Sequence, residues 1–416
     1  MTRAQDVYTQ FGVPNSNERG IDVVTDAEGA TFVLAYTDGA LFPKQTGSND
    51  IVLMKYGPDH TQRLWGVQVG TADPDRPFDI TVDRLGNPII ACQLASGLAA
   101  LIKYSSSGTH VWTKTFGQTS VNGVAVASDG SIFFVGTATA SASTPIRLVR
   151  CSPQGVVLWE QKTGQSGDYG VAIDLDPDDN PMFLVAVNQG STYFNGVYRY
   201  DALGVFKWYQ TFGAPASNTP HDIVVDSVGD AIICGTSTNT WPNNQHLGKG
   251  DAFVIKIDGM SGSAMWYRSV GTVQADVAWG VTVDGADNVY IAGKTEASIE
   301  PGVWHGGASD YFLARLVGPQ GVVEWVEQFG TGDDDVAHGV TVDVYGNVIF
   351  TGYVVGAVLV MALIIALVVR SRNQRPVDDI TPNGPLAVTT NPLYMHTNIN
   401  ANSNNINNND NRSSEV

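Results

Sequence analysis

The segment FKWYQTFG, residues 206–213, is one of six near-copies spread along the chain. The others read RLWGVQVG, HVWTKTFG, VLWEQKTG, AMWYRSVG and VEWVEQFG, and in each the tryptophan stands five residues before a glycine. Successive tryptophans are separated by 47, 47, 49, 58 and 59 residues, and a seventh copy at residues 6–12 has Val7 in the tryptophan position. A period of this length indicates a repeat architecture, in which each unit buries its apolar faces against its neighbours. The tryptophans are Trp65, Trp112, Trp159, Trp208, Trp266 and Trp325.

Two further elements recur within each period. Segments such as GVTVDVYGNVIFTG (339–352) and DITVDRLGNPIIAC (79–92) are pairs of β-branched runs joined by an Asp/Gly turn, which is typical of a β-hairpin. DAFVIKID (251–258) and its copies add a third strand, and the tryptophan segment adds a fourth. Four short strands in about 50 residues are the signature of a propeller blade. The sequence therefore predicts an all-β propeller, most simply of seven blades with four short antiparallel strands each. The last blade is expected to be incomplete, because its hairpin is followed by no third strand.

The combination "GVTVD…GNVYIAG…DAFVIKID…W…FG" resembles a β-propeller repeat family of the SBBP type, which occurs in many secreted and cell-surface proteins. The resemblance covers residues 6–352 and implies the propeller fold. It implies little about activity, since the repeated residues belong to the scaffold and propellers carry unrelated functions.

Charged residues recur at two fixed points of the repeat. The hairpin turn carries an aspartate in six units, with Ala127 in the third, and the third strand carries one cation per unit. A calcium or catalytic ring is one reading of the aspartates, and turn formation is the favoured one, since Asp bonds its own backbone in turns. We expect acids and bases to pair and to hold the register of the blades. The aspartates are Asp26, Asp83, Asp174, Asp226, Asp284 and Asp343; the cations are Lys55, Lys103, Arg150, Arg199, Lys256 and Arg315.

The loops between second and third strands vary most in length. Variable loops on a rigid scaffold are where binding residues usually lie. We therefore expect ligand contacts at Trp241, His246, Trp304 and His305, on two of the long loops. The repeated tryptophans, by contrast, are expected to be packing wedges between blades.

No catalytic or cofactor motif stands out, and we predict neither an enzyme nor a cofactor. The patterns HExxH, GxSxG and GxGxxG do not occur in the sequence. The best metal candidate is DLDPDDN (174–180), with Asp174, Asp176 and Asp178 at alternate positions, but it lacks the glycine and distal glutamate of a calcium loop. No metal is therefore predicted. The acidic run Asp333–Asp335 is expected to be a solvated loop.

A charge-free apolar run extends from Tyr353 to Val369. Its 17 residues span about 26 Å as a helix at roughly 1.5 Å per residue, whereas a buried strand needs only about 4 to 8 residues. Arg370, Arg372 and Arg375 follow at once and predict a cytoplasmic C-terminus. The expected domains are a propeller (1–352), a transmembrane helix (353–369) and a cytoplasmic, Asn-rich disordered tail (370–416). The start of the chain lacks a signal peptide, so an external propeller predicts further sequence upstream.

The tail contains NPLY, with Asn391, Pro392 and Tyr394. This resembles the NPxY peptide that PTB-type adaptors bind, and implies a possible cytoplasmic partner. Taken together, the sequence predicts a single-pass protein of the plasma membrane whose external propeller is a receptor or adhesion module for a protein or glycan. The net charge of −18 counts against nucleic acid as a partner. The alternative is a membrane-tethered enzyme acting on extracellular glycans, which would need two carboxylates and a histidine or tyrosine within reach of one another.

Overall fold

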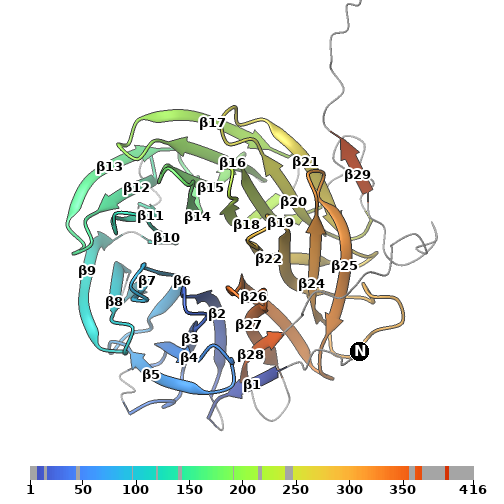
Figure 1. Ribbon diagram of the computed structural model, residues 1–416, viewed down its shortest axis with the longest axis horizontal. Coiled ribbons are helices and arrows are strands. Elements are labelled where there is room, and N and C mark those ends of the chain that lie inside the picture. The colour runs from blue at the N-terminus through green and yellow to red at the C-terminus, as the bar shows by residue number, and fades with distance from the viewer. Residues whose placement is uncertain are drawn as a thin grey trace, which may run out of the picture.

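The computed structural model describes residues 7–13, 16–43, 47–95, 97–118, 120–138, 143–190, 192–213, 218–238, 247–355, 361–367 and 389–392. Its sheets stand around a central axis like the blades of a propeller (Figure 1). The pairs between strands are antiparallel, and six blades contain four strands that follow one another in the chain; one of these sheets gains a fifth strand, Thr389–Pro392. The predicted all-β propeller is therefore confirmed, with six such blades and not the seven predicted.

The strands of the six consecutive blades run from the axis outward, with the tryptophan strand outermost. Blade 1 contains β2 (Glu18–Thr25), β3 (Thr31–Thr37), β4 (Asp50–Tyr56) and β5 (Arg63–Val69); blade 2, β6 (Arg76–Val82), β7 (Pro88–Leu94), β8 (Leu98–Tyr104) and β9 (His110–Gln118); blade 3, β10 (Gly123–Val126), β11 (Ile132–Thr137), β12 (Ile146–Cys151) and β13 (Val157–Thr163); blade 4, β14 (Tyr169–Leu175), β15 (Pro181–Asn188), β16 (Tyr193–Tyr200) and β17 (Phe206–Phe212); blade 5, β18 (Asn218–Val225), β19 (Ala231–Ser237), β20 (Asp251–Ile257) and β21 (Ala264–Val270); blade 6, β22 (Asp276–Val283), β23 (Val289–Thr295), β24 (Asp310–Val317) and β25 (Val322–Phe329).

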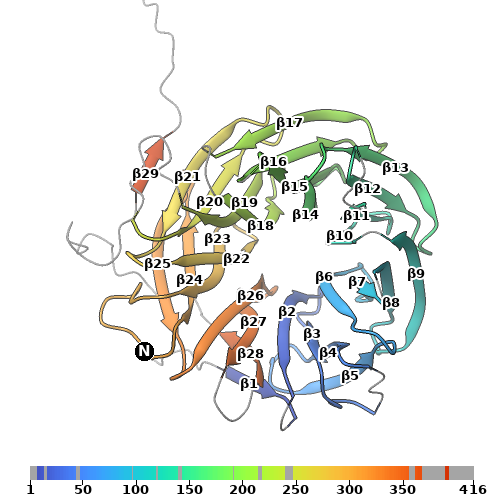
Figure 2. The same cartoon turned by 180° about the vertical axis from the view of Figure 1, so that it is seen from behind.

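One further four-stranded sheet joins the two ends of the ring, and we call it the closing sheet (Figure 2). Its strands are, from the axis outward, β26 (Asp334–Val342), β27 (Val348–Val355), β28 (Met361–Leu367) and β1 (Val7–Phe11). The N-terminal strand thus takes the outermost position, as the seventh sequence copy predicted. The third strand that the sequence analysis found missing is β28.

The predicted transmembrane helix over residues 353–369 is not confirmed. Tyr353 and the two residues after it end β27, whereas Met361–Leu367 pair with β27 on one side and with β1 on the other. These described parts of the apolar run are strands, and a strand with neighbours on both sides can be as apolar as a membrane segment. No helix within the described ranges is long and apolar enough to cross a membrane.

The core lies between the blades, where apolar residues of neighbouring sheets interdigitate. Phe32 and Leu53 of blade 1, for example, belong to one buried cluster with Ile90 of blade 2. Trp65 packs edge-on against Phe32 at 5.9 Å between ring centroids, and its Nε1 donates to the carbonyl of Ser106 in the next blade at 3.0 Å. The repeated tryptophan is therefore a wedge between blades, as expected from its placement in every unit.

The predicted pairing of turn aspartates with third-strand cations is present, with two corrections. The fourth turn is closed by Asp176, not Asp174, because β14 continues through Leu175. In blade 3, where Ala127 occupies the turn, Arg150 pairs with Asp129 instead. Asp343 of the closing sheet pairs with His60 at 2.9 Å. The remaining pairs are Lys55–Asp26 (3.0 Å), Lys103–Asp83 (2.8 Å), Arg199–Asp176 (2.7 Å), Lys256–Asp226 (2.5 Å) and Arg315–Asp284 (3.7 Å).

Candidate functional site

Six of the seven innermost strands, all but β10, carry a β-bulge at a fixed position near their start. The strand register shifts, for example, between Gly20 and Asp22 in β2 and between Ala278 and Gly280 in β22. A bulge leaves one residue unpaired and redirects its side chain. The unpaired residues are half-buried on the strands that surround the axis, and we call them the bulge residues: Ile21, Phe78, Val171, His221, Trp279 and His338.

Three of these bulge residues form a row of rings along one side of the axis. The ring of Trp279 lies 4.0 Å from that of His221 in blade 5 and 5.1 Å from that of His338 in the closing sheet. Tyr353 of β27 continues the row at 5.5 Å from His338, and the guanidinium of Arg19 lies 4.3 Å above the Tyr353 ring. The row thus extends from blade 5 through blade 6 and the closing sheet to blade 1. We call these five residues the ring row.

Both imidazoles of the ring row are uncharged at neutral pH. Burial, and then the neighbouring His338, lower the pKa of His221 to about 3. Burial and the nearby Arg19 lower the pKa of His338 to about 4. A neutral imidazole has one N–H donor and one acceptor nitrogen, so each ring offers hydrogen bonds without a charge. The indole Nε1 of Trp279 has no hydrogen-bond partner among the described residues.

Four aspartates connect neighbouring innermost strands beside the bulges. In each, one carboxylate oxygen accepts the N–H of the next residue in its own strand, and the other oxygen accepts an N–H of the following innermost strand. These bonds between strands are Ile80 N to Asp22 at 3.3 Å, Val124 N to Asp79 at 2.6 Å, Val225 N to Asp174 at 2.8 Å and Val281 N to Asp222 at 2.9 Å. The carboxylates therefore act as clamps between blades.

Asp22 and Asp79 are close together, because the N–H of Ile80 donates to both at 3.3 and 2.7 Å. Burial, followed by the charge of Asp22, raises the pKa of Asp79 well above its usual range. Two carboxylates in one channel meet part of the requirement for the glycan-cleaving alternative. Their oxygens, however, accept backbone N–H groups of three strands, so the arrangement fits a structural role better than acid–base catalysis.

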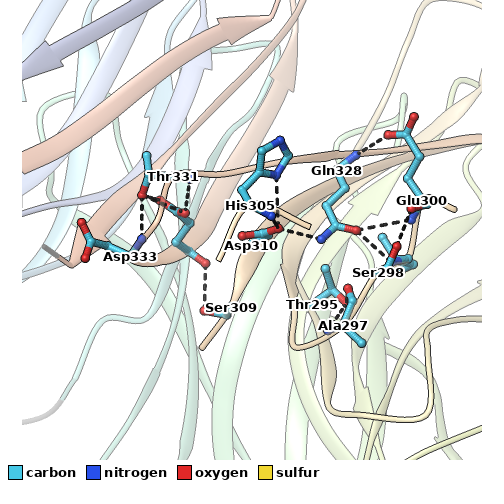
Figure 3. A network of polar contacts seen from close by, with 12 residues as sticks. Thr295, Ala297, Ser298, Glu300, His305, Ser309, Asp310, Gln328, Thr331 and Asp333 are labelled. Carbon is cyan, nitrogen blue, oxygen red and sulfur yellow. Dashed lines mark hydrogen bonds and ion pairs between the residues drawn. The ribbon is translucent and has the colours of Figure 1, made fainter. Parts of the chain in front are cut away.

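The structure describes two of the four loop residues that the sequence predicts as ligand contacts. Trp241 and His246 lie outside the described residues. Trp304 is 42% exposed on the β23–β24 loop. His305 is a loop anchor: its backbone N–H donates to Asp310 Oδ2 at 2.9 Å, and its Nδ1 lies 3.2 Å from the same oxygen (Figure 3). Gln328 donates to that oxygen as well, at 2.7 Å.

The acidic run Asp333–Asp335 is not a solvated loop throughout, because its last two residues begin β26. Asp335 is fully buried, and its carboxylate accepts the N–H of Thr331 at 2.7 Å. Burial raises the pKa of Asp335 to about 6. The network in Figure 3 therefore holds the loops of blade 6 and the closing sheet in place.

The three carboxylates proposed for a weak metal site have different partners. Asp174 clamps blades 4 and 5, Asp176 pairs with Arg199, and Asp178 is exposed in the turn. A cavity of about 250 Å³ lies against Asp174 and Asp176, with Arg84 also in its wall. In the part of the chain that the structure describes, no group of three or more His, Cys, Asp or Glu side chains is placed to hold a metal ion.

The tail motif is described only in part. Asn391 and Pro392 belong to β29 (Thr389–Pro392), which pairs with the outermost strand of blade 5, Pro392 opposite Trp266. Tyr394 lies outside the described residues. The predicted adaptor contact therefore stays a prediction.

Sequence reasoning did not identify the ring row, although a signal was present. In the aligned repeats, the bulge residue directly precedes the DIVVD- or GVTVD-type hairpin strand. That column is apolar in three copies, Ile21, Phe78 and Val171, is Asn122 in the third unit, and changes to His221, Trp279 and His338 in the last three. A change of residue type at one position of a repeat marks where the symmetry is broken.

Comparison with known proteins defines the class no further than a β-propeller repeat protein. No family model matches the chain. An uncharacterized WD repeat-containing protein, L264, of Acanthamoeba polyphaga mimivirus is 24% identical over 254 residues, which cover 55% of this chain and 16% of the viral protein. The C-terminal WD40 domain of Sif2 is similar with a TM-score of 0.47 and 9% identity, over 86% of this chain and 98% of that domain. The chain thus corresponds to a small part of the viral protein's length.

Proposed function

We propose that this propeller is a protein-interaction module that holds its partner at the ring row. The observation that carries the proposal is the asymmetry of the bulge residues: three are Ile21, Phe78 and Val171, whereas His221, Trp279 and His338 stand side by side. Packing of the blades requires the same residue type in every unit, so a run of polar rings on one side indicates a different task. Half-buried aromatic rings and arginine are the residues that most often dominate binding energy at interfaces.

The position of the ring row supports the same conclusion. Its residues lie on strands of the scaffold near the axis, where bulges and interblade clamps fix their orientation. Contact residues on rigid elements lose little conformational entropy when a partner binds. Uncharged imidazoles and the indole also avoid the cost of removing full charges from water.

Replacing Trp279 with alanine is expected to weaken partner binding at least tenfold, about 1.4 kcal/mol. The probe is a displayed library of linear peptides, selected on the purified full chain and then measured against variants. Trp279→Phe keeps a ring and removes the indole N–H, so it separates stacking from hydrogen bonding. Trp304→Ala, on an exposed loop, is the matched control and is expected to leave binding unchanged.

Thermal unfolding of each variant shows whether it has kept its fold. Equal binding by wild type and a folded Trp279→Ala protein would remove the ring row from the interface. Loss of binding in Trp304→Ala alone would place the site on the variable loops, as the sequence analysis expected.

The plasma-membrane location, and with it the receptor or adhesion role, stays a prediction. It rests on the apolar run and the three arginines after it. In the structure, however, Met361–Leu367 form β28, and the same residues cannot form a propeller strand and part of a membrane helix at the same time. Cells that express a version tagged at both termini provide the test. For the receptor reading, surface labelling of intact cells is expected to reach the N-terminal tag only. Protection of both tags, or labelling of the C-terminal tag, would refute this topology.

A further inference from the structure

Two arginines occupy equivalent positions on neighbouring innermost strands. Arg19 in β2 and Arg76 in β6 each stand three residues before an interblade clamp, Asp22 or Asp79. Burial raises the pKa of Tyr36; the charges of Arg19 and Arg76 oppose this rise, and the carboxylate of Asp38 adds to it. Arg19 is half-buried against Tyr353, and Arg76 is exposed. Together they extend the end of the ring row from blade 1 to blade 2.

Neither guanidinium has a carboxylate partner within 4.0 Å among the residues that the structure describes. The third-strand cations are paired, as in Lys55–Asp26 and Lys103–Asp83. An acidic protein that leaves two neighbouring arginines unpaired at one end of its axis keeps a local excess of positive charge there. At an ionic strength of about 0.15 M, charges more than about 8 Å away are largely screened, so this local excess decides what binds in contact.

The ring edges of the ring row are positively polarised, so they have the same sign as the two arginines. His221, Trp279 and His338 pack against one another, so their neighbours occupy much of the ring faces. The edges of aromatic rings are positively polarised, and here they also carry N–H donors. The Trp279 Nε1–H has no acceptor within the described part of the chain, but it is buried and is not itself exposed to a ligand. The part of this surface that favours an anion is therefore the pair of arginines, with the positive ring edges beside it.

The interblade carboxylates on the same strands do not offset this preference. Each oxygen of Asp22 and Asp79 already accepts a backbone N–H, at distances of 2.6 to 3.3 Å. These carboxylates are thus engaged with the scaffold. Arg19 and Arg76 have no such partner and remain available to a ligand.

We infer that the site takes an acidic peptide segment, whose carboxylate is bound by Arg19 and Arg76 while an adjacent part of the segment lies along Trp279. This inference rests on the proposed function. Guanidinium groups bind carboxylates through paired, charge-assisted N–H···O bonds, which makes arginine better suited to this task than lysine. A cationic segment is disfavoured, because it would meet two positive charges and the positive edges of the rings.

The experiment selects peptides from a displayed library of random linear sequences on the purified full chain. Selected peptides are expected to be enriched in Asp and Glu relative to the starting library. The best acidic peptide is then synthesised together with its Glu→Gln and Asp→Asn version. We expect the neutral version to bind at least tenfold more weakly, and the acidic one to lose affinity as salt is raised.

Variants of the protein assign this effect to the two arginines. Arg19→Gln with Arg76→Gln is expected to lower the affinity for the acidic peptide at least tenfold and to leave the neutral peptide unaffected. Arg19→Lys, which keeps the charge, is expected to restore part of the loss. The matched control is Arg84→Gln, because Arg84 follows the opposite end of the same strand β6. This control is expected to bind like wild type.

The outcomes separate the inference from the proposed function. Selection of neutral or basic peptides whose binding depends on Trp279 but not on Arg19 and Arg76 would overturn the inference and leave the proposed function intact. Peptides that bind a folded Trp279→Ala protein as well as wild type would overturn the proposed function itself. Equal loss of acidic-peptide binding in the Arg84→Gln control would show that net charge, and not this site, attracts the peptide, and so would also overturn the inference.

Discussion

Gly339→Ala is expected to lower the free energy of unfolding by about 3 kcal/mol, because it overfills the contact that closes the ring. Gly339 lies on the innermost strand of the closing sheet and faces blade 1. A Cβ at this position would lie 2.7 Å from Asp22 Cα and 2.9 Å from Val23 N, and in closer conflict with Asp22 Oδ1. Two of these atoms belong to the backbone of β2, so the conflict cannot be relieved by turning a side chain. The closing sheet must move away from blade 1.

Denaturant unfolding measures this effect, and Gly332→Ala is its matched control. Gly332 lies in the loop that precedes the same strand, and a Cβ there would meet nothing within 4 Å. This control is expected to change stability by less than about 1 kcal/mol in either direction. If Gly339→Ala unfolds at the same denaturant concentration as wild type, the contact between β26 and β2 does not limit ring closure.

The repeat determined which parts of the fold were predictable. The tryptophan strands and the Asp/Gly hairpins recur with local signatures, so their identity did not depend on distant parts of the chain. The pairing of Lys256 with Asp226 followed from equal placement in successive units. In the fourth unit the same reasoning chose Asp174, because DLDPDD offers four carboxylates, and only the end of β14 shows that the turn starts at Asp176.

The closing sheet and the ring row depend on contacts across the whole ring. Met361–Leu367 are read as part of a membrane helix unless β1, more than three hundred residues away in sequence, is known to lie beside them. His221 and Trp279 likewise belong to different blades, and the unpaired positions that bring their rings together exist only after each innermost strand has bulged. Local patterns carry no information about such neighbours.

Between pH about 6.5 and about 8, the protein is expected to lose stability as the pH rises, and Asp222 is the main cause. Burial raises the pKa of Asp222 to about 8 and that of Asp276 to about 7, against the usual 3.8. The folded state therefore binds these protons more tightly than the unfolded chain. The resulting stabilisation is complete below about pH 4 and is lost as the pH rises through the folded-state pKa.

The histidines of the ring row set the lower limit of this window. The pKa values of His221 and His338 are lowered to about 3 and about 4, so these groups add stability as the pH rises to 6.5 and none beyond it. Above about pH 7, where Asp276 is losing its proton, Asp222 and Asp79 are the clamps whose pKa burial raises furthest. The ionisation of Asp222 is expected to contribute a decrease of about 1 kcal/mol between about pH 7 and about pH 8 in denaturant unfolding. In Asp222→Asn, which cannot ionise, the slope over the same interval is expected to be smaller by that amount.

The lower stability of the Asp222→Asn protein does not affect the comparison, because the comparison uses the dependence of stability on pH. An asparagine keeps one acceptor oxygen and places an N–H₂ donor against the second backbone N–H, so Asp222→Asn is expected to be about 2 kcal/mol less stable near pH 7. Only the slope above pH 7 reports the ionisation of Asp222. An unchanged slope in the variant would mean that this clamp is already ionised, and that its hydrogen bonds from Ile223 and Val281 outweigh the cost of burying its charge.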